Sequence, residues 1–214
     1  MASVHTNTPV ALTQRVGFLA LVCFIGVGCS LIRSEGQPRS PVPLPSPPSP
    51  RSVYFIPIGD FSVSDLDSLV AHYQAKFDLT VEILPSIEIP DDAVDSSRNQ
   101  VIAERLIDAI GASRDVSADP TGVVIGLTST DLYIAGVSSW RYAFGLRAKD
   151  HLAVVSTARM SEFFHSREMR RLEKMVTRDI GILYFGLPLS DDPGSVLYRD
   201  IGGPDDLDNM SEDF

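Results

Sequence analysis

The stretch that most constrains this chain covers residues 171–197, RLEKMVTRDIGILYFGLPLSDDPGSVL. Its first part predicts a helix, because one set of residues recurs at helical spacing: Leu172, Met175, Val176, Asp179 and Leu183. The last two turns of this helix are apolar nearly all round, which indicates burial. Gly186 and Pro188 then predict a sharp stop, since glycine accepts a left-handed backbone and proline cannot continue a helix.

The same stretch resembles the active-site segment of archaemetzincins, which are zinc proteases. Their pattern is HExxHxxGxxHC, then a short loop, then a second Cys close to a Met. Gly186-Leu187-Pro188 matches the Gly-x-x part without gaps, and residues 191–194 resemble the loop before the second Cys. In this register the histidine, glutamate, cysteine and methionine positions all hold other residues: Asp179, Ile180, Leu183, Leu189, Ser190, Ser195 and Leu197.

These replacements remove the chemistry that the resemblance implies. Asp179, Leu183 and Leu189 stand at the three His positions, and Ile180 stands at the position of the catalytic Glu. Leucine offers zinc no lone pair and isoleucine cannot act as a base. Moving the register by one residue, with Arg178 and Asp179 over His-Glu, also yields no ligand pair. We therefore expect no catalytic residue, no metal ligand and no bound zinc.

Two other interpretations of the stretch stay open. A rebuilt metal site could combine His165 and Asp179 with Asp191 or Asp192, which would make the chain a zinc-dependent metallopeptidase with a replaced metal site. An ordinary buried helix followed by a surface turn would also explain these residues without any ancestral enzyme. If the zinc centre has become packing, Leu183 should be buried, and Asp179 should be exposed or paired with a base such as Arg159 or Arg199.

Charge and cysteine content exclude several classes of function. The formal net charge is −10 and the pI is about 4.7, which argues against nucleic acid as a partner, because phosphate binding needs a basic face. Cys23 and Cys29 are the only cysteines, and both lie within the first 30 residues. The rest of the chain therefore has no disulfide framework and no catalytic thiol.

The N-terminal region predicts export. Residues 16–28 form an apolar run of signal-peptide length, and Gly26-Val27-Gly28-Cys29 resembles a bacterial lipobox, in which the cysteine is lipidated. We interpret residues 1–28 as a signal peptide and residues 29–52 as the lipidated Cys29 plus a proline-rich tether. The chain would then be an exported, membrane-associated bacterial envelope lipoprotein, periplasmic or extracellular; a plain signal peptide and an uncleaved anchor are the alternatives.

Residues 53–214 predict one α/β domain. Apolar runs at 53–59, 79–84 and 123–127 indicate strands, the third of them central, and 141–147 with 151–157 indicate a further strand pair. Helices are expected from Ser64, over 97–112 and over 166–185, with a short one at 204–210. This order implies a mixed, mostly parallel sheet with packed helices and a long helix near the C-terminus, an α+β arrangement like that of metzincins.

The archaemetzincin resemblance extends through this domain in short matches. They are Arg98 with Gln100, then Asp131-Leu132-Tyr133, Phe144-Gly145, Val154-Val155-Ser156 and Arg159. Together with the lost zinc motif, they imply a non-catalytic, archaemetzincin-like lipoprotein. Its old cleft would bind a peptide or an envelope protein, or the domain would have a purely structural role.

Overall fold

The computed structural model describes residues 51–113, 119–148, 151–161 and 164–214. The expected signal peptide, Cys29 and the expected tether up to residue 50 lie outside these described residues. All described residues belong to the unit Pro43–Phe214. None of the helices in this part of the chain is long and apolar enough to span a membrane.

A five-stranded sheet has the order β2-β1-β5-β8-β7. Its members are β1 (Val53–Ile58), β2 (Val81–Ile83), β5 (Val123–Thr128), β7 (Gly145–Ala148) and β8 (Leu152–Ser156). Four strands run parallel, and β7 pairs antiparallel with β8 at one edge. All six residues of β5 are buried, because this strand lies in the middle of a sheet covered on both faces. The predicted mixed, mostly parallel sheet with a central third strand is confirmed.

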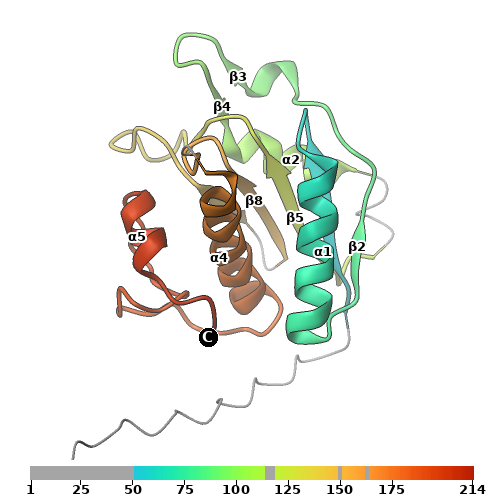
Figure 1. The fold of residues 1–214 in the computed structure, drawn as a ribbon. Helices are drawn as coiled ribbons and strands as arrows, with labels where there is room; N and C mark the ends of the chain where they lie inside the picture. Colours follow the sequence, from blue (N-terminus) through green and yellow to red (C-terminus); the bar gives the residue numbers. More distant parts are fainter. Residues whose placement is uncertain (1–50, 114–118, 149–150, 162–163) are drawn as a thin grey trace, which may run out of the picture. The chain divides into compact units, whose positions relative to one another are not determined.

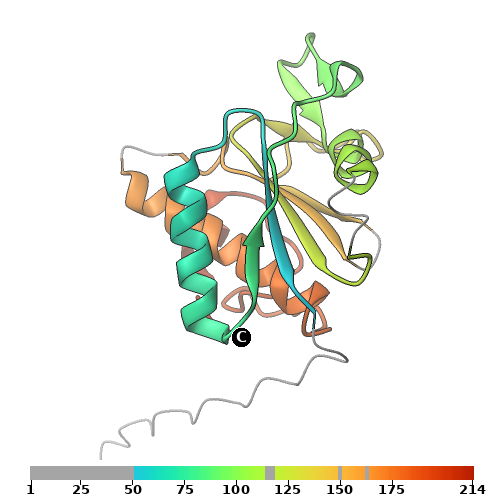
Figure 2. The same ribbon diagram turned by 90° about the vertical axis from the view of Figure 1, so that its right-hand side faces the viewer.

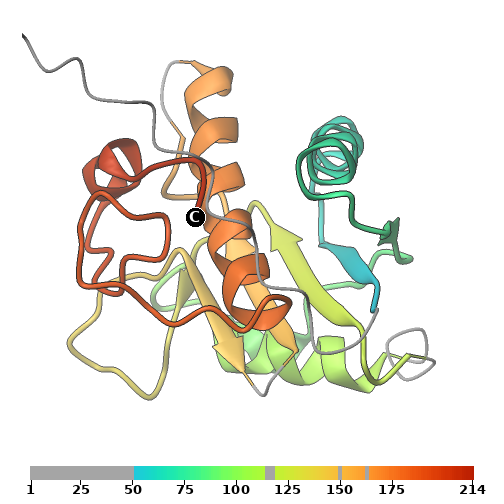
Figure 3. The ribbon, with the colours of Figure 1, turned by 90° about the horizontal axis from the view of Figure 1, so that it is seen from below.

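Helices cover both faces of this sheet. Helices α1 (Val63–Phe77) and α4 (His165–Leu183) lie on one face, and α2 (Ala103–Ala112) lies on the other, as Figure 3 shows. The strands alternate accordingly: on β5, Val123, Ile125 and Leu127 pack toward α1 and α4, whereas Val124 packs toward α2. In Figure 1, α1 and α4 stand side by side in front of the sheet. These three main helices agree with the prediction.

The region between residues 91 and 102 differs from the prediction. A loop and the start of a helix at residue 97 were expected, but the structure has η1 (Asp91–Ala93), β3 (Val94–Asp95) and β4 (Gln100–Ile102). These two strands and β6 (Leu132–Tyr133) form a second, three-stranded sheet, and the β3–β4 hairpin extends at the top of Figure 2. The Asp95 Oδ1 accepts hydrogen bonds from the backbone N–H groups of Ser97 and Arg98, and Asn99 has φ 52°, so a turn replaces the expected helical start.

The C-terminal elements follow the prediction closely. Helix α4 is 19 residues long, and Gly186 after it has φ 69°, the left-handed backbone that the stop signal requires. The chain then returns along α4 to the short helix α5 (Pro204–Asn209). A Cβ on Gly181 of α4 would lie 2.5 Å from the ring of Phe214, so only glycine lets the end of the chain pack against this helix.

Candidate functional site

A cavity of about 730 Å³ lies between α4, the edge strand β7 and the segment that returns after the Gly186 turn. Residues 140–147 line it from the sheet side, and residues 199–202 line it from the returning segment. Met175, Arg178 and Asp179 line it from the helix. Its volume falls in the range of small-molecule and peptide pockets. We call this cavity, which adjoins the segment compared with the zinc site, the α4–β7 cleft.

Asp179, at the position of the first zinc-binding histidine, forms an ion pair in the α4–β7 cleft. Its side chain is 2% exposed, and its Oδ1 accepts a hydrogen bond of 2.8 Å from Arg147 Nη1 on β7. The prediction of a basic partner is confirmed, but both candidate partners were wrong. Arg159 pairs with Asp131, and Arg199 pairs with Asp191. The reason is topological: the edge strand brings Arg147 against α4 from 32 positions away.

The side chains at the other two helical positions compared with the zinc motif are buried in the core. Ile180 is fully buried and Leu183 is 6% exposed, and both belong to the core cluster between the sheet and α4. The expected burial of Leu183 is therefore confirmed. Leu189, at the third histidine position, is 39% exposed and lies beyond the turn. Hydrocarbon side chains occupy these three positions, so they supply no group that could bind a metal or take a proton.

The two serines at the cysteine positions stabilise the loop after the helix. Ser190 Oγ accepts a hydrogen bond from Asp192 N–H at 3.1 Å, and Ser195 Oγ accepts one from Leu197 N–H at 3.1 Å. Leu197, at the methionine position, is 9% exposed and packs into the same core cluster as Leu183. The loop keeps a fixed shape through turn hydrogen bonds, as serine side chains commonly provide.

The donor set does not fit a zinc centre. Within the described ranges, no group of three His, Cys, Asp or Glu residues is placed to hold a metal ion. The hypothesised rebuilt site is not assembled, because His165 lies at the start of α4 and bonds Asp65 at 3.1 Å. Fourteen helical positions, roughly 21 Å at 1.5 Å per residue, separate His165 from Asp179. Asp191 is engaged with Arg199.

Three buried basic residues on α4 were missed by the sequence analysis. Arg171 is 1% exposed, Lys174 is 8% exposed and Arg178 is 6% exposed. Arg178 lines the α4–β7 cleft, its Nε donates to Tyr198 O at 3.0 Å, and burial together with the nearby charge of Arg147 lowers its pKa to about 10. The signal was present in the sequence: positions 171, 174 and 178 share one helical face, which the apolar pattern alone does not reveal.

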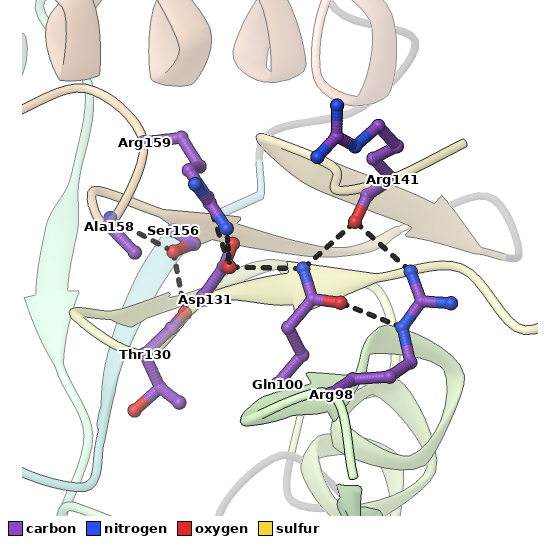
Figure 4. A network of polar contacts seen from close by, with 8 residues as sticks. All are labelled: Arg98, Gln100, Thr130, Asp131, Arg141, Ser156, Ala158 and Arg159. Atoms are coloured by element: carbon purple, nitrogen blue, oxygen red, sulfur yellow. Dashed lines mark hydrogen bonds and ion pairs between the residues drawn. The ribbon is translucent and has the colours of Figure 1, made fainter.

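A polar network supports the mouth of the cleft, and four of its members come from the weak sequence matches noted above. Gln100 Nε2 donates to Asp131 Oδ2 and to Arg141 O, both at 3.0 Å, and Arg98 Nη2 donates to Arg141 O at the same distance. Arg159 Nε donates to Asp131 Oδ2 at 3.0 Å. Figure 4 shows these residues converging beside the strand ends. The network holds the backbone of the 140–142 segment in place.

Solved structures with a similar fold include archaemetzincins and a zinc-dependent peptidase. Archaemetzincin from Methanopyrus kandleri is 25% identical with a TM-score of 0.63, over 78% of this chain and 91% of that one. Archaemetzincin from Archaeoglobus fulgidus, complexed with malonate, is 20% identical with a TM-score of 0.62, over 75% and 94%. A zinc-dependent peptidase from Methanocorpusculum labreanum is 21% identical with a TM-score of 0.62, over 76% and 95%.

The chain is therefore archaemetzincin-like in fold, as the sequence resemblance implied. No protein-family model matches the sequence, and no curated protein matches it. Similarity at this level establishes the architecture. It leaves activity and ligand to be argued from the residues of the cleft.

Proposed function

We propose that this chain is a non-catalytic peptide- or protein-binding domain, exported and held at a membrane through lipidated Cys29. The observation that supports binding without catalysis is the α4–β7 cleft. It has a volume of about 730 Å³, but the position of its first zinc ligand holds Asp179, whose carboxylate is bound to Arg147. A surface cleft of this volume is large enough to take up a ligand.

The edge strand β7 offers the backbone groups that an extended peptide uses. It is the last strand of the sheet, and Ser156 N–H on β8 donates to the Phe144 carbonyl just before β7. In an antiparallel pair, such bonded positions alternate with outward-facing ones. The N–H and C=O groups of Gly145 and Arg147 therefore face the outer edge, beside the cleft. A peptide that adds a strand to this edge would gain main-chain hydrogen bonds there.

Peptide binding can be tested on the purified full chain with a library of displayed linear peptides, followed by affinity measurements on the selected sequences. Trp140 lines the cleft and is 53% exposed, the kind of aromatic anchor that dominates binding energy. We expect Trp140→Ala to weaken binding by roughly 2 kcal/mol. Phe164→Ala is the matched control, since Phe164 is 67% exposed and does not line the cleft.

If no peptide binds, or if both alanine variants bind as tightly as the parent protein, the peptide-binding proposal fails. Zinc analysis addresses the competing function, a metallopeptidase with a replaced metal site, which the description of the Methanocorpusculum labreanum structure as a zinc-dependent peptidase supports. We expect the dialysed protein to contain far less than one equivalent of zinc and to leave peptides uncut. Stoichiometric zinc together with hydrolysis that a chelator abolishes would establish the peptidase instead.

Membrane attachment is a separate part of the proposal. It depends on the apolar run at 16–28 followed by Cys29. We expect the parent protein to incorporate labelled palmitate and to partition into detergent, and Cys29→Ser to lose both properties. An unlabelled, water-soluble parent protein would contradict the lipid anchor and would leave the binding proposal unaffected.

A further inference from the structure

The α4–β7 cleft has the opposite charge to the chain that contains it. A second hollow, lined among others by Arg98, Gln100 and Arg159, adjoins the cleft and shares Trp140, Arg141 and Tyr142 with it. Two aspartates, Asp179 and Asp200, line the two hollows together with six arginines, which gives a net charge of +4. The arginines are Arg98, Arg141, Arg147, Arg159, Arg178 and Arg199. Asp131 and Asp191 pair with two of these arginines and reduce the excess to +2, whereas the whole chain carries −10.

Arg178 has unused donors at the floor of the cleft. Its Nε bonds Tyr198 O, and in the described part of the chain its two Nη nitrogens have neither a hydrogen-bond acceptor nor a carboxylate within ion-pair distance. Neither Nη is among the enclosed polar atoms that lack a partner, so both keep contact with solvent. A side chain that is 6% exposed therefore presents four N–H donors to the cleft.

The neighbouring ion pair does not neutralise Arg178. Asp179 is already bonded to Arg147 at 2.8 Å, so the three charges at the floor sum to +1. The lowered pKa of Arg178 has the same physical origin, since burial and the charge of Arg147 both disfavour another positive charge. A guanidinium in this situation is stabilised most by an anion that its planar fork can bind through two parallel hydrogen bonds.

Arg141 provides a second basic position at the mouth. Its carbonyl is held by Arg98 and Gln100, while its guanidinium makes no hydrogen bond or ion pair with the described residues. In Figure 4 this side chain points away from the network that fixes its backbone. The mouth and the floor thus each present an arginine that has no carboxylate partner within the described ranges, and both arginines line the same cleft.

We propose that the α4–β7 cleft recognises an acidic peptide, with one carboxylate on Arg178 at the floor and another near Arg141 at the mouth. The inference rests on the proposed peptide-binding function and specifies its ligand class. Two separated basic positions favour acidic side chains over a peptide C-terminus, because a C-terminus supplies one carboxylate only.

The test uses the purified full chain and a fluorescent, acetylated and amidated peptide of about seven residues, in which glutamate alternates with leucine as on an extended strand. A second peptide replaces every glutamate with glutamine. Charge-assisted hydrogen bonds contribute about 1.5–3 kcal/mol each, so we expect the glutamine peptide to bind at least about tenfold more weakly. Binding of the glutamate peptide should also weaken as salt rises.

Variants assign the effect to the cleft. Arg178→Met should weaken binding of the glutamate peptide about tenfold, and Arg141→Gln should weaken it by a smaller factor. Arg105→Gln is the control, because Arg105 is a half-exposed arginine of α2 outside both hollows. Arg141→Gln removes a side chain that has no partner among the residues the structure describes, so it keeps the test interpretable if Arg178→Met fails to fold.

Each outcome decides between the two proposals. Equal affinity for the glutamate and glutamine peptides overturns the acidic specificity and leaves peptide binding intact. Undiminished binding by both arginine variants overturns it as well, as does binding that requires a free C-terminus. If neither designed peptide binds and the displayed library also yields no binder, the acidic specificity and the peptide-binding function fail together.

Discussion

Two buried arginines lie two turns apart on α4 and have opposite surroundings. Arg171 donates from Nε and Nη2 to the two carboxylate oxygens of Asp208 on α5, at 2.8 and 2.6 Å, and from Nη1 to Met160 O. Among the described residues Arg178 has a single hydrogen bond, to Tyr198 O, and it faces the α4–β7 cleft. The first arginine joins two helices, and the second is left with donors for a ligand. Burial alone therefore does not distinguish a structural charge from a binding one; the carboxylate partner does.

The largest stability effect is expected at a residue of the same helix that carries no charge. Leu183→Ala should lower the free energy of unfolding by about 2–5 kcal/mol, because it leaves a cavity in the core between α4 and the sheet. Leu183→His should also destabilise, since a lone imidazole finds no second ligand. Urea denaturation measures both. Leu189→Ala, at a position 39% exposed, is the control, and an equal loss there would contradict the packing role of Leu183.

The ion pair of Arg171 can be removed by mutating its carboxylate partner, Asp208. Asp208→Ala removes the carboxylate that pairs with the buried Arg171, so we expect the free energy of unfolding to fall by about 2–4 kcal/mol. This loss is smaller than for a fully buried ion pair, because Asp208 is 37% exposed and solvent screens its charge. Asp213→Ala is the control, since Asp213 is 78% exposed in its pair with Lys76. A change no larger than that of the control would show that Arg171 does not depend on Asp208.

The same pair predicts a dependence on acid. Hydrogen bonds from Arg171 hold the pKa of Asp208 below its usual value. A carboxylate whose folded-state pKa is lowered stabilises the fold above its unfolded-state pKa, and this stabilisation is lost as pH falls through the folded-state value. Asp208→Asn should therefore differ most from the parent protein at neutral pH and least in strong acid. Thermal unfolding across an acid series measures this difference, and a constant difference would contradict the ion pair.

Replacing Arg178 should change the stability of the protein in the opposite direction. Burial lowers the pKa of Arg178 from its usual value to about 10, which corresponds to roughly 3 kcal/mol of unfavourable burial, and the hydrogen bond to Tyr198 O returns about 1 kcal/mol. Arg178→Met should thus raise the free energy of unfolding by about 1–2 kcal/mol. Arg171→Met should lower it, because Asp208 then loses its partner. A loss of stability in both variants would remove the contrast between the two arginines.

Alkaline pH sharpens this prediction. The folded-state pKa of Arg178 lies below its unfolded-state pKa, so the unfavourable burial is present in full below about pH 10 and fades above it. The stability gain of Arg178→Met over the parent protein should therefore shrink between about pH 9 and about pH 11. Parallel urea denaturation of the two proteins measures the gain at each pH. A gain that grows with pH would contradict the buried charge.

The smallest effect is expected at the mouth of the cleft. Arg141→Gln should change the free energy of unfolding by less than about 0.5 kcal/mol, because its side chain has no partner among the described residues and surface changes of this kind are nearly neutral. Thermal unfolding of the variant and the parent protein measures this change. A loss above about 1 kcal/mol would show that Arg141 supports the fold, which would weaken its assignment to ligand binding.

Local sequence pattern was sufficient wherever one element carries its own signal. The apolar run of β5 predicted a central strand, and Gly186 before Pro188 predicted the end of α4. Local pattern was insufficient at residues 94–102, where the β3–β4 hairpin depends on hydrogen bonds that Asp95 accepts from the turn and on pairing with β6. The predicted helical spacing holds for Leu106 and Ile110, which are buried on α2, whereas residues 97–102 form a turn and a strand.

The sequence by itself determined the sheet, the long helix and the turn after it, because each is a property of residue type and spacing. The tertiary structure alone decided which charged side chains form ion pairs. It placed Arg147 of the edge strand on Asp179 and gave Arg171 the carboxylate of Asp208, and it left Arg178 facing the cleft without a carboxylate partner in the described part of the chain. These pairings join residues roughly thirty or more positions apart, so the spacing of residues within one helix or strand cannot predict them. Their energies depend on burial, which exists only once the sheet and α4 have packed together.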